Sequence, residues 1–148
     1  MKYLIILLSL LIFTSCATYS DEELQSFDQQ IQDYLSKKGI SDYQKSESGL
    51  YYKIMEQGEG KKVQYKDVIS FKYRGELLNG LVFDEKKQPI DFELKELIAC
   101  WKEVILELNE GGKAFLVSPP QLGYGDHKLD DIPQSSILVF NLEVVEVK

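Results

Sequence analysis

The chain has few of the residues that carry metal, redox or nucleic-acid chemistry. Its 148 residues include one histidine and two cysteines, and 17 basic residues stand against 24 acidic ones, which gives a net charge of −7. A negative protein is repelled by phosphate backbones, so we exclude nucleic acid as a partner. Two cysteines do not establish a disulfide, because each can have a separate role. We therefore predict neither a metal site nor another cofactor.

Long apolar runs are also lacking, and the longest one is at the N-terminus. The apolar run over residues 3–13 follows Lys2 and is shorter than the roughly 20 residues of a membrane span, but it suits the core of a secretion signal. The small residues before Cys16 resemble the lipobox of bacterial lipoproteins. This resemblance implies a signal peptide over residues 1–15 and a lipidated Cys16 that anchors the chain in the membrane. An ordinary secretory signal with an incidental cysteine is the alternative.

The next segment has the pattern of an amphipathic helix. Ser20 and the acidic residues after it are typical of a helix start, and Gly39 follows as a stop. One apolar stripe over residues 21–38 consists of Leu24, Phe27, Ile31 and Leu35. Packing on its own domain is favoured over a dimerising arm, because a short helix needs a packing partner. We interpret residues 41–48 as a linker, so residues 16–48 precede a folded domain over residues 49–148.

Alternating apolar residues and turn signals predict several strands in that domain. Strands are expected over residues 50–55, 68–73, 113–118 and 137–147. Gly75 indicates a bulge, and Asn79-Gly80 predicts a two-residue hairpin turn. These strands, with one short helix between them, predict an α+β domain in which an antiparallel sheet wraps around the helix.

The predicted short helix carries the only tryptophan. Apolar residues recur at helical spacing at Leu97, Ile98, Trp101, Ile105 and Leu108. We expect Asn109, Glu110, Gly111 and Gly112 to end this helix. Downstream, Tyr124 lies between two glycines, which suits a side chain presented at the mouth of a cavity.

Several separated motifs together resemble the FKBP-type peptidyl-prolyl cis-trans isomerases. They are SFKYRG (70–75), NGLVFD (79–84), IACW (98–101), GGKAFLVSPPQLGYG (111–125) and IPQSSILVFNLE (132–143). The resemblance covers residues 49–148. It implies a twisted antiparallel sheet curled around the short helix, with an apolar pocket between them.

The resemblance also implies a set of site residues. Four are implied in catalysis, with Trp101 as the pocket floor: Tyr73, Asp84, Trp101 and Tyr124. The implied substrate-binding residues are Phe83, Ile90, Leu97, Ile98, Ile132 and Phe140. In the family, the tyrosine hydroxyl at Tyr124 and the backbone N–H at Ile98 donate to ligand carbonyls. Taken singly, the aromatic residues are also consistent with core packing, and Asp84 with capping the turn after the hairpin.

The implied function is isomerisation of proline-containing segments of exported proteins in the bacterial envelope. The alternative is a non-catalytic peptide-binding module or chaperone with the same pocket. Ile90 stands where the family usually has an aromatic residue, and the segments around it are shorter. Macrolide inhibitors are further expected ligands, although this lower wall favours peptides over them. Ala17, after Cys16, favours the outer membrane, with the protein facing the periplasm. We expect Cys100 to be a small buried thiol and His127 a solvated loop residue.

Overall fold

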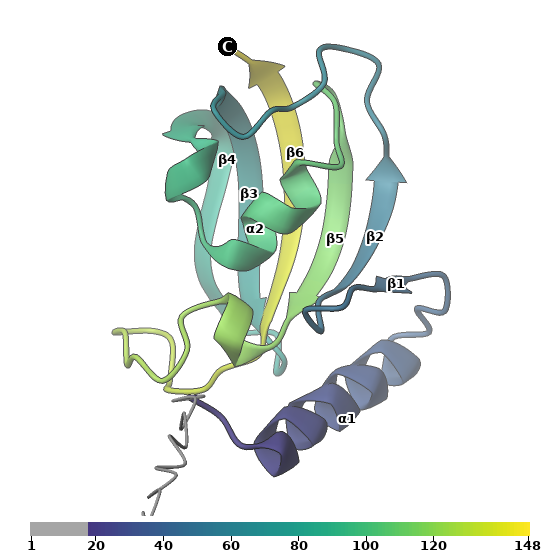
Figure 1. The fold of residues 1–148 in the computed structure, drawn as a ribbon, viewed down its shortest axis with the longest axis vertical. Helices are drawn as coiled ribbons and strands as arrows, with labels where there is room; N and C mark the ends of the chain where they lie inside the picture. The colour runs from purple at the N-terminus through teal and green to yellow at the C-terminus, as the bar shows by residue number, and fades with distance from the viewer. Residues whose placement is uncertain (1–17) are drawn as a thin grey trace, which may run out of the picture.

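The computed structural model describes residues 18–148, which form a six-stranded antiparallel sheet with one helix on each face (Figure 1). The strand order is β1-β2-β5-β6-β3-β4. In chain order the elements are α1 (Asp21–Lys37), β1 (Gln44–Lys45), β2 (Tyr51–Glu56), β3 (Val68–Leu77), β4 (Val82–Glu93), the 3-10 helix η1 (Leu94–Glu96), α2 (Ala99–Ile105), β5 (Lys113–Ser118), the 3-10 helix η2 (Pro120–Leu122) and β6 (Leu138–Val147). The predicted α+β architecture is confirmed.

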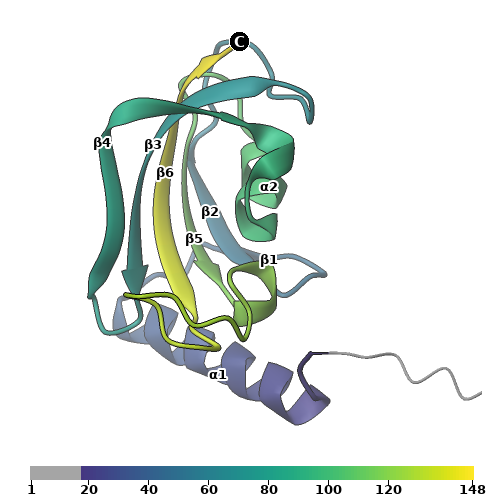
Figure 2. The same ribbon diagram turned by 90° about the vertical axis from the view of Figure 1, so that its left-hand side faces the viewer.

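The main core lies between α2 and the concave face of the sheet (Figure 2). Strand residues alternate between the two faces, so Ile69, Phe71 and Tyr73 of β3 point toward α2. Trp101 and Val104 of α2 are buried against them. The long strands β3, β4 and β6 curve around α2 (Figure 2). Helix α2 places Trp101 against the concave face of the sheet.

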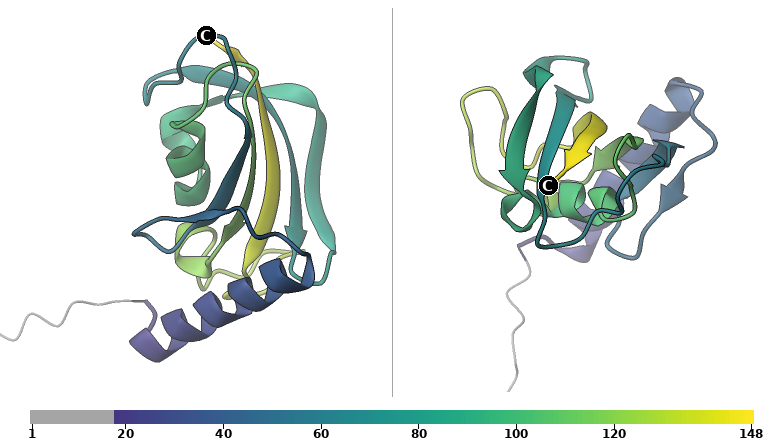
Figure 3. Two further views of the ribbon diagram at one scale, coloured as in Figure 1. Left: turned by 90° about the vertical axis from the view of Figure 1, so that its right-hand side faces the viewer. Right: turned by 90° about the horizontal axis from the view of Figure 1, so that it is seen from above.

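Helix α1 packs on the opposite face of the sheet, across one end of the strands (Figure 3). It begins with the predicted cap: the Glu23 backbone N–H donates to Ser20 Oγ at 3.3 Å, and the Ser20 N–H donates to the Glu23 carboxylate at 2.8 Å. Ile31 and Leu35 are fully buried against a cluster that includes Val117. The stripe therefore packs within its own domain, as favoured from the sequence. No helix among residues 18–148 is long and apolar enough to cross a membrane.

Three local predictions need correction, and the first concerns residues 41–48. They are not only a linker, because they contain the short strand β1, which pairs with Tyr51 and Tyr52 at the edge of the sheet. The predicted signal peptide and the lipidation at Cys16 lie outside the described residues.

The predicted two-residue turn at Asn79-Gly80 is wrong. The connection between β3 and β4 spans residues 78–81, with the Gly80 N–H donating to the Leu77 carbonyl and the Leu77 N–H to the Leu81 carbonyl. Gly80 has φ of 87°, but Asn79 does not have a positive φ, because Ser135 is the only non-glycine residue with positive φ among residues 18–148. A two-residue type I′ turn needs positive φ at both central residues. The longer loop needs a positive φ at one residue, and Gly80 supplies it.

The predicted helix stop at residues 109–112 is also wrong, because α2 ends at Ile105. The Asn109 N–H donates to the Gln57 carbonyl at 3.0 Å, which draws the chain away from the helix axis. Gly111, with φ of 84°, instead forms the tight turn that leads into β5.

Candidate functional site

A cavity of about 240 Å³ opens between α2, the sheet and the loop that follows η2. Trp101 comes from α2, Tyr73 from β3, and Phe140 from β6. The full lining is Tyr73, Phe83, Asp84, Trp101, Tyr124, Leu129, Asp130, Asp131, Ile132 and Phe140. The structure thus brings together seven of the ten residues that the sequence placed in one pocket.

The floor of the cavity is an aromatic cluster around Trp101. Its ring lies 4.7 Å from that of Tyr73, 5.0 Å from that of Phe140 and 5.3 Å from that of Phe71, measured between centroids. The Phe71 and Phe140 rings are close to perpendicular to the indole, which is the favoured edge-to-face arrangement. Trp101 is 6% exposed, and within residues 18–148 its Nε1–H has no hydrogen-bond acceptor. The floor is therefore mostly aromatic carbon, with the indole N–H as a polar group within it.

Gly75 shapes one wall, although it does not line the cavity. A Cβ at this position would lie 2.6 Å from two Phe83 ring atoms and 2.8 Å from Phe140 Cε1. The register of β3 on β4 shifts between Gly75 and Glu76, so the predicted bulge is present. The structure adds the reason for glycine: it leaves room for the Phe83 ring over the strand.

Asp84 is held by two hydrogen bonds. The Tyr73 hydroxyl donates to Asp84 Oδ2 at 2.5 Å, and Lys86 Nζ donates to Oδ1 at 3.1 Å. Asp84 lies inside β4 and so does not cap the turn after the hairpin. Burial alone would raise the pKa of Asp84, but the two hydrogen bonds outweigh it and hold that pKa below its usual value. Burial, followed by the contact with Asp84, raises the pKa of Tyr73.

Tyr124 is presented at the cavity by the glycine on its C-terminal side. Gly125 has φ of 62°, and its N–H donates to the Pro120 carbonyl at 2.9 Å, which turns the chain back toward η2. The Tyr124 hydroxyl has no hydrogen-bond partner in the part of the chain that the structure describes. Burial raises its pKa, so at neutral pH the hydroxyl is protonated and is able to donate.

The other three sequence-derived residues lie beside the cavity and do not line it. Ile90 is half-buried in β4 opposite Phe71, and Leu97 is buried just before α2. Ile98 is the residue that precedes the first turn of α2, and within the described chain its own N–H meets no acceptor. All three side chains pack on the core that carries Trp101.

The structure also adds lining residues that sequence reasoning did not place in the site. Leu129, Asp130 and Asp131 form the outer rim. The signal available in the sequence was their position between Tyr124 and Ile132, two residues already assigned to the pocket.

The remaining reactive side chains do not contribute to this cavity. Cys100 is fully buried, and burial raises the pKa of its thiol to about 12. His127 is exposed, with its ring 3.2 Å from the Tyr124 carbonyl. Within residues 18–148 no group of three or more His, Cys, Asp or Glu side chains is arranged to hold a metal ion.

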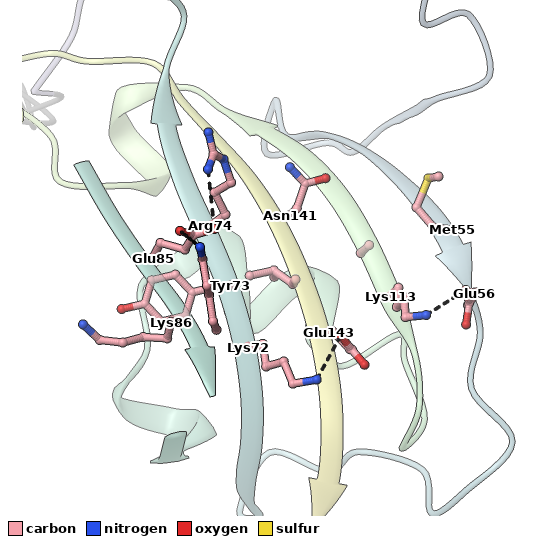
Figure 4. Close-up of a pocket in the computed structure, with 13 residues that line it drawn as sticks. Met55, Glu56, Lys72, Tyr73, Arg74, Glu85, Lys86, Lys113, Asn141 and Glu143 are labelled. Carbon is pink, nitrogen blue, oxygen red and sulfur yellow. Dashed lines mark hydrogen bonds and ion pairs between the residues drawn. The ribbon is translucent and has the colours of Figure 1, made fainter. Parts of the chain in front are cut away.

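A larger hollow of about 410 Å³ lies over the face of the sheet that points away from α2 (Figure 4). Its basic side chains are paired with acidic neighbours: Lys72 with Glu143 at 3.5 Å and Lys113 with Glu56 at 2.9 Å. Compensated charges on an open strand surface offer a ligand few unpaired groups. The aromatic cavity beside α2 is therefore the better candidate site.

Comparison with known proteins gives one consistent family. A family model described as FKBP-type peptidyl-prolyl cis-trans isomerase matches residues 59–145, more than half of the chain. The FKBP-type peptidyl-prolyl cis-trans isomerase FkpA of Buchnera aphidicola subsp. Schizaphis graminum is 40% identical over 115 residues, which are 75% of this chain and 44% of the relative. FkpA of Escherichia coli strain K12 is 35% identical over 118 residues, 78% of this chain and 43% of the relative.

A solved structure agrees with these sequence matches. The crystal structure of FkpA from Escherichia coli is similar with a TM-score of 0.74 and 31% identity, covering 86% of this chain and 62% of that one. The chain spans less than half the length of the two FkpA sequences it matches.

Proposed function

The chain belongs to the family of FKBP-type peptidyl-prolyl cis-trans isomerases, and from this premise we propose that it catalyses cis-trans isomerisation of X-Pro bonds in polypeptides. The observation that carries the proposal is the aromatic cavity with Trp101 as its floor. Its volume of about 240 Å³ suits a proline ring and the adjoining peptide bond.

The reaction needs no nucleophile and no metal, because no covalent bond is made or broken. Rotation about the X-Pro bond is slow since amide resonance is lost at a barrier of about 18–20 kcal/mol. In water, hydrogen bonds to the carbonyl reinforce that resonance. The dry floor around Trp101 replaces those waters and favours the twisted amide over the planar one. Lowering the barrier by about 4 kcal/mol gives roughly a thousandfold rate.

Particular groups are proposed to position the substrate. The proline ring rests on Trp101, with Tyr73, Phe83, Phe140 and Ile132 as walls. The Tyr124 hydroxyl and the Ile98 N–H, which meet no acceptor within residues 18–148, donate to substrate carbonyls. Ile90 and Leu97 support the aromatic walls of the cavity from the core. Asp84 holds the Tyr73 ring in place through its hydrogen bond.

A protease-coupled proline-peptide assay tests this proposal. We expect the full chain, purified in mild detergent, to isomerise the peptide faster than the detergent blank. Tyr124→Phe and Trp101→Ala should both lower kcat/KM, Trp101→Ala by tenfold or more because the floor is lost. Unchanged rates in both variants would rule out the proposed site.

The second candidate function is a binding module or chaperone that uses the same cavity without appreciable turnover. The observation that favours it is that Ile90, half-buried in β4, does not line the cavity, in line with the lower wall expected from the sequence. A rate equal to the blank, together with saturable binding of a proline peptide, would support this function over the isomerase. Macrolide inhibitors are proposed as competing ligands, and displacement of the peptide by such a compound measures their affinity.

We further propose that the protein acts on exported proteins in the bacterial envelope, anchored through a lipid on Cys16. The support is the apolar run before Cys16, and Ala17 favours the outer membrane, with the domain facing the periplasm. Mass spectrometry of the membrane-extracted protein should find acyl chains on an N-terminal Cys16. A Cys16→Ser variant that still partitions with membranes would contradict the anchor.

A further inference from the structure

Among the described residues, the lining of the proposed substrate cavity carries three carboxylates and no cationic side chain. They are Asp84, Asp130 and Asp131. Asp84 is compensated by Lys86 at 3.1 Å and accepts a hydrogen bond from Tyr73. Asp130 and Asp131 are exposed, and among residues 18–148 neither has an ion-pair partner.

The groups nearest in the chain do not cancel this charge. The rim segment, residues 126–131, contains three aspartates and one lysine, so its formal charge is −2 with His127 neutral. The His127 ring lies 3.2 Å from the Tyr124 carbonyl and 3.5 Å from the Asp126 carboxylate, and among residues 18–148 it forms no ion pair with Asp130 or Asp131. Lys128 is exposed and, within the described residues, forms no ion pair. The mouth of the cavity therefore keeps a net negative charge.

The floor and the rim of the cavity differ in chemistry. Trp101 is more than nine-tenths buried, and its ring and aromatic neighbours provide a mainly apolar floor, in which Nε1–H is a polar group without an acceptor among residues 18–148. The rim loop is closed by backbone hydrogen bonds from the Leu129 N–H to the Ile132 carbonyl, 3.0 Å, and from the Ser135 N–H to the Gly125 carbonyl, 2.9 Å. These bonds fix Asp130 and Asp131 at the entrance. A ligand that places an apolar ring on the floor must hold its flanking residues at this negative entrance.

We propose that the cavity prefers proline segments that carry a lysine or arginine beside the X-Pro pair. This inference rests on the proposed function and specifies its substrate class. The aliphatic stem of such a side chain lies on Leu129, which is 41% exposed, while its cation approaches Asp130 and Asp131. An acidic residue in the same place is repelled.

A set of matched peptides tests the preference. The peptides share one X-Pro pair and differ only in a flanking residue, which is lysine, glutamine or glutamate, placed before or after the pair in turn. Isomerisation is followed by NMR exchange, because a coupled protease would have its own charge preference. At 20 mM salt we expect kcat/KM for the lysine peptide to exceed that for the glutamate peptide by about 5- to 10-fold in at least one placement. At 500 mM salt the ratio should fall below about 2-fold.

Charge variants distinguish the effect of the rim aspartates from the effect of the protein's overall electrostatic field. Asp130→Asn with Asp131→Asn should bring the lysine-to-glutamate ratio below about 2-fold. Glu59→Gln with Glu146→Gln changes the net charge by the same amount at the other end of the sheet, beside the chain's C-terminus, and should keep the wild-type ratio. Circular dichroism and melting temperatures check that both variants fold. A ratio near one in the wild type, or equal losses in the two variants, would overturn the proposal.

Binding separates this inference from the proposed activity. Trp101 is the only tryptophan and forms the floor, so its fluorescence reports occupancy without turnover. If no peptide is isomerised, the enzymatic proposal fails, and a lower Kd for the lysine peptide still supports the rim preference. Equal Kd values, or no binding of any peptide, contradict it.

Discussion

Replacing Gly75 by alanine tests whether the shape of the cavity depends on one missing methyl group. The new Cβ would lie 2.6 Å from two Phe83 ring atoms and 2.8 Å from Phe140 Cε1. Carbon atoms prefer a separation of roughly 3.5–4.0 Å, so the Phe83 ring must recede by about 1 Å. Phe83 lines the cavity, so displacing its ring changes the position of the cavity wall.

The expected cost follows from two opposing terms. Overpacking of this kind destabilises by about 1–3 kcal/mol. Alanine is better than glycine inside a strand by about 0.5–1 kcal/mol. We therefore expect a net loss of about 1–2 kcal/mol in the free energy of unfolding. A displacement of about 1 Å in a substrate wall is expected to lower kcat/KM by about tenfold or more.

Gly80→Ala is the matched control. Gly80 has φ of 87° and nothing within 4 Å of an added Cβ, so its variant is strained without touching the cavity. This strain costs on the order of 1–2 kcal/mol, comparable with the loss at Gly75. Urea unfolding should give similar losses for both variants, whereas the proline-peptide assay should show a large loss of kcat/KM only for Gly75→Ala. Equal activity in the two variants would refute the argument.

Three further predictions concern the carboxylate, the thiol and the first helix. Tyr73→Phe removes a hydrogen bond to Asp84, so NMR titration should show the pKa of Asp84 rising toward its usual value; no rise would contradict the assigned bond. Since that pKa is lowered in the folded chain, the ionised carboxylate stabilises the fold above the usual carboxyl pKa, and this contribution is lost as the pH falls through the lowered value. Cys100 should resist iodoacetamide at pH 8 until the chain unfolds, because burial raises its pKa to about 12; peptide mass spectrometry detects labelling, and rapid labelling of the folded chain would count against the buried position. Leu35→Ala should lower the free energy of unfolding by about 3 kcal/mol, measured in one cooperative urea transition, because Leu35 is buried under the sheet. The control Ser36→Ala, at an exposed position, should change stability little. A separate early transition would show that α1 does not unfold with the rest of the domain.

The sequence predicted features whose causes are local or periodic. Ser20 and Glu23 carry their own capping pattern, and the helix starts where they indicate. The alternation of Ile69, Phe71 and Tyr73 assigned the core face of β3 correctly. These patterns remain readable because each is fixed by side chains only a few positions apart.

Features that depend on distant partners were not predictable in this way. Strand β1 is a two-residue segment of polar side chains that exists because Tyr51 and Tyr52 offer it an edge. Asp130 and Asp131 reach the cavity because a hydrogen bond between Ser135 and Gly125 closes their loop. The need for glycine at position 75 is set by a ring from the next strand. No periodicity in the sequence encodes such contacts.

Unpaired donors connect the fold to the proposed function. Three donors lack acceptors within residues 18–148: the Tyr124 hydroxyl, the Ile98 N–H and Trp101 Nε1. Tyr124 and Trp101 line the cavity, and Ile98 lies beside it. A buried donor without an acceptor costs about 1–3 kcal/mol, so folding alone does not favour leaving the buried Trp101 Nε1–H unpaired. A peptide segment brings carbonyl oxygens into this region, which the dry floor otherwise keeps free of acceptors. The proposed substrate thus supplies acceptors that the folded chain withholds, and carbonyls outside the rotating X-Pro amide accept these bonds without reinforcing its resonance.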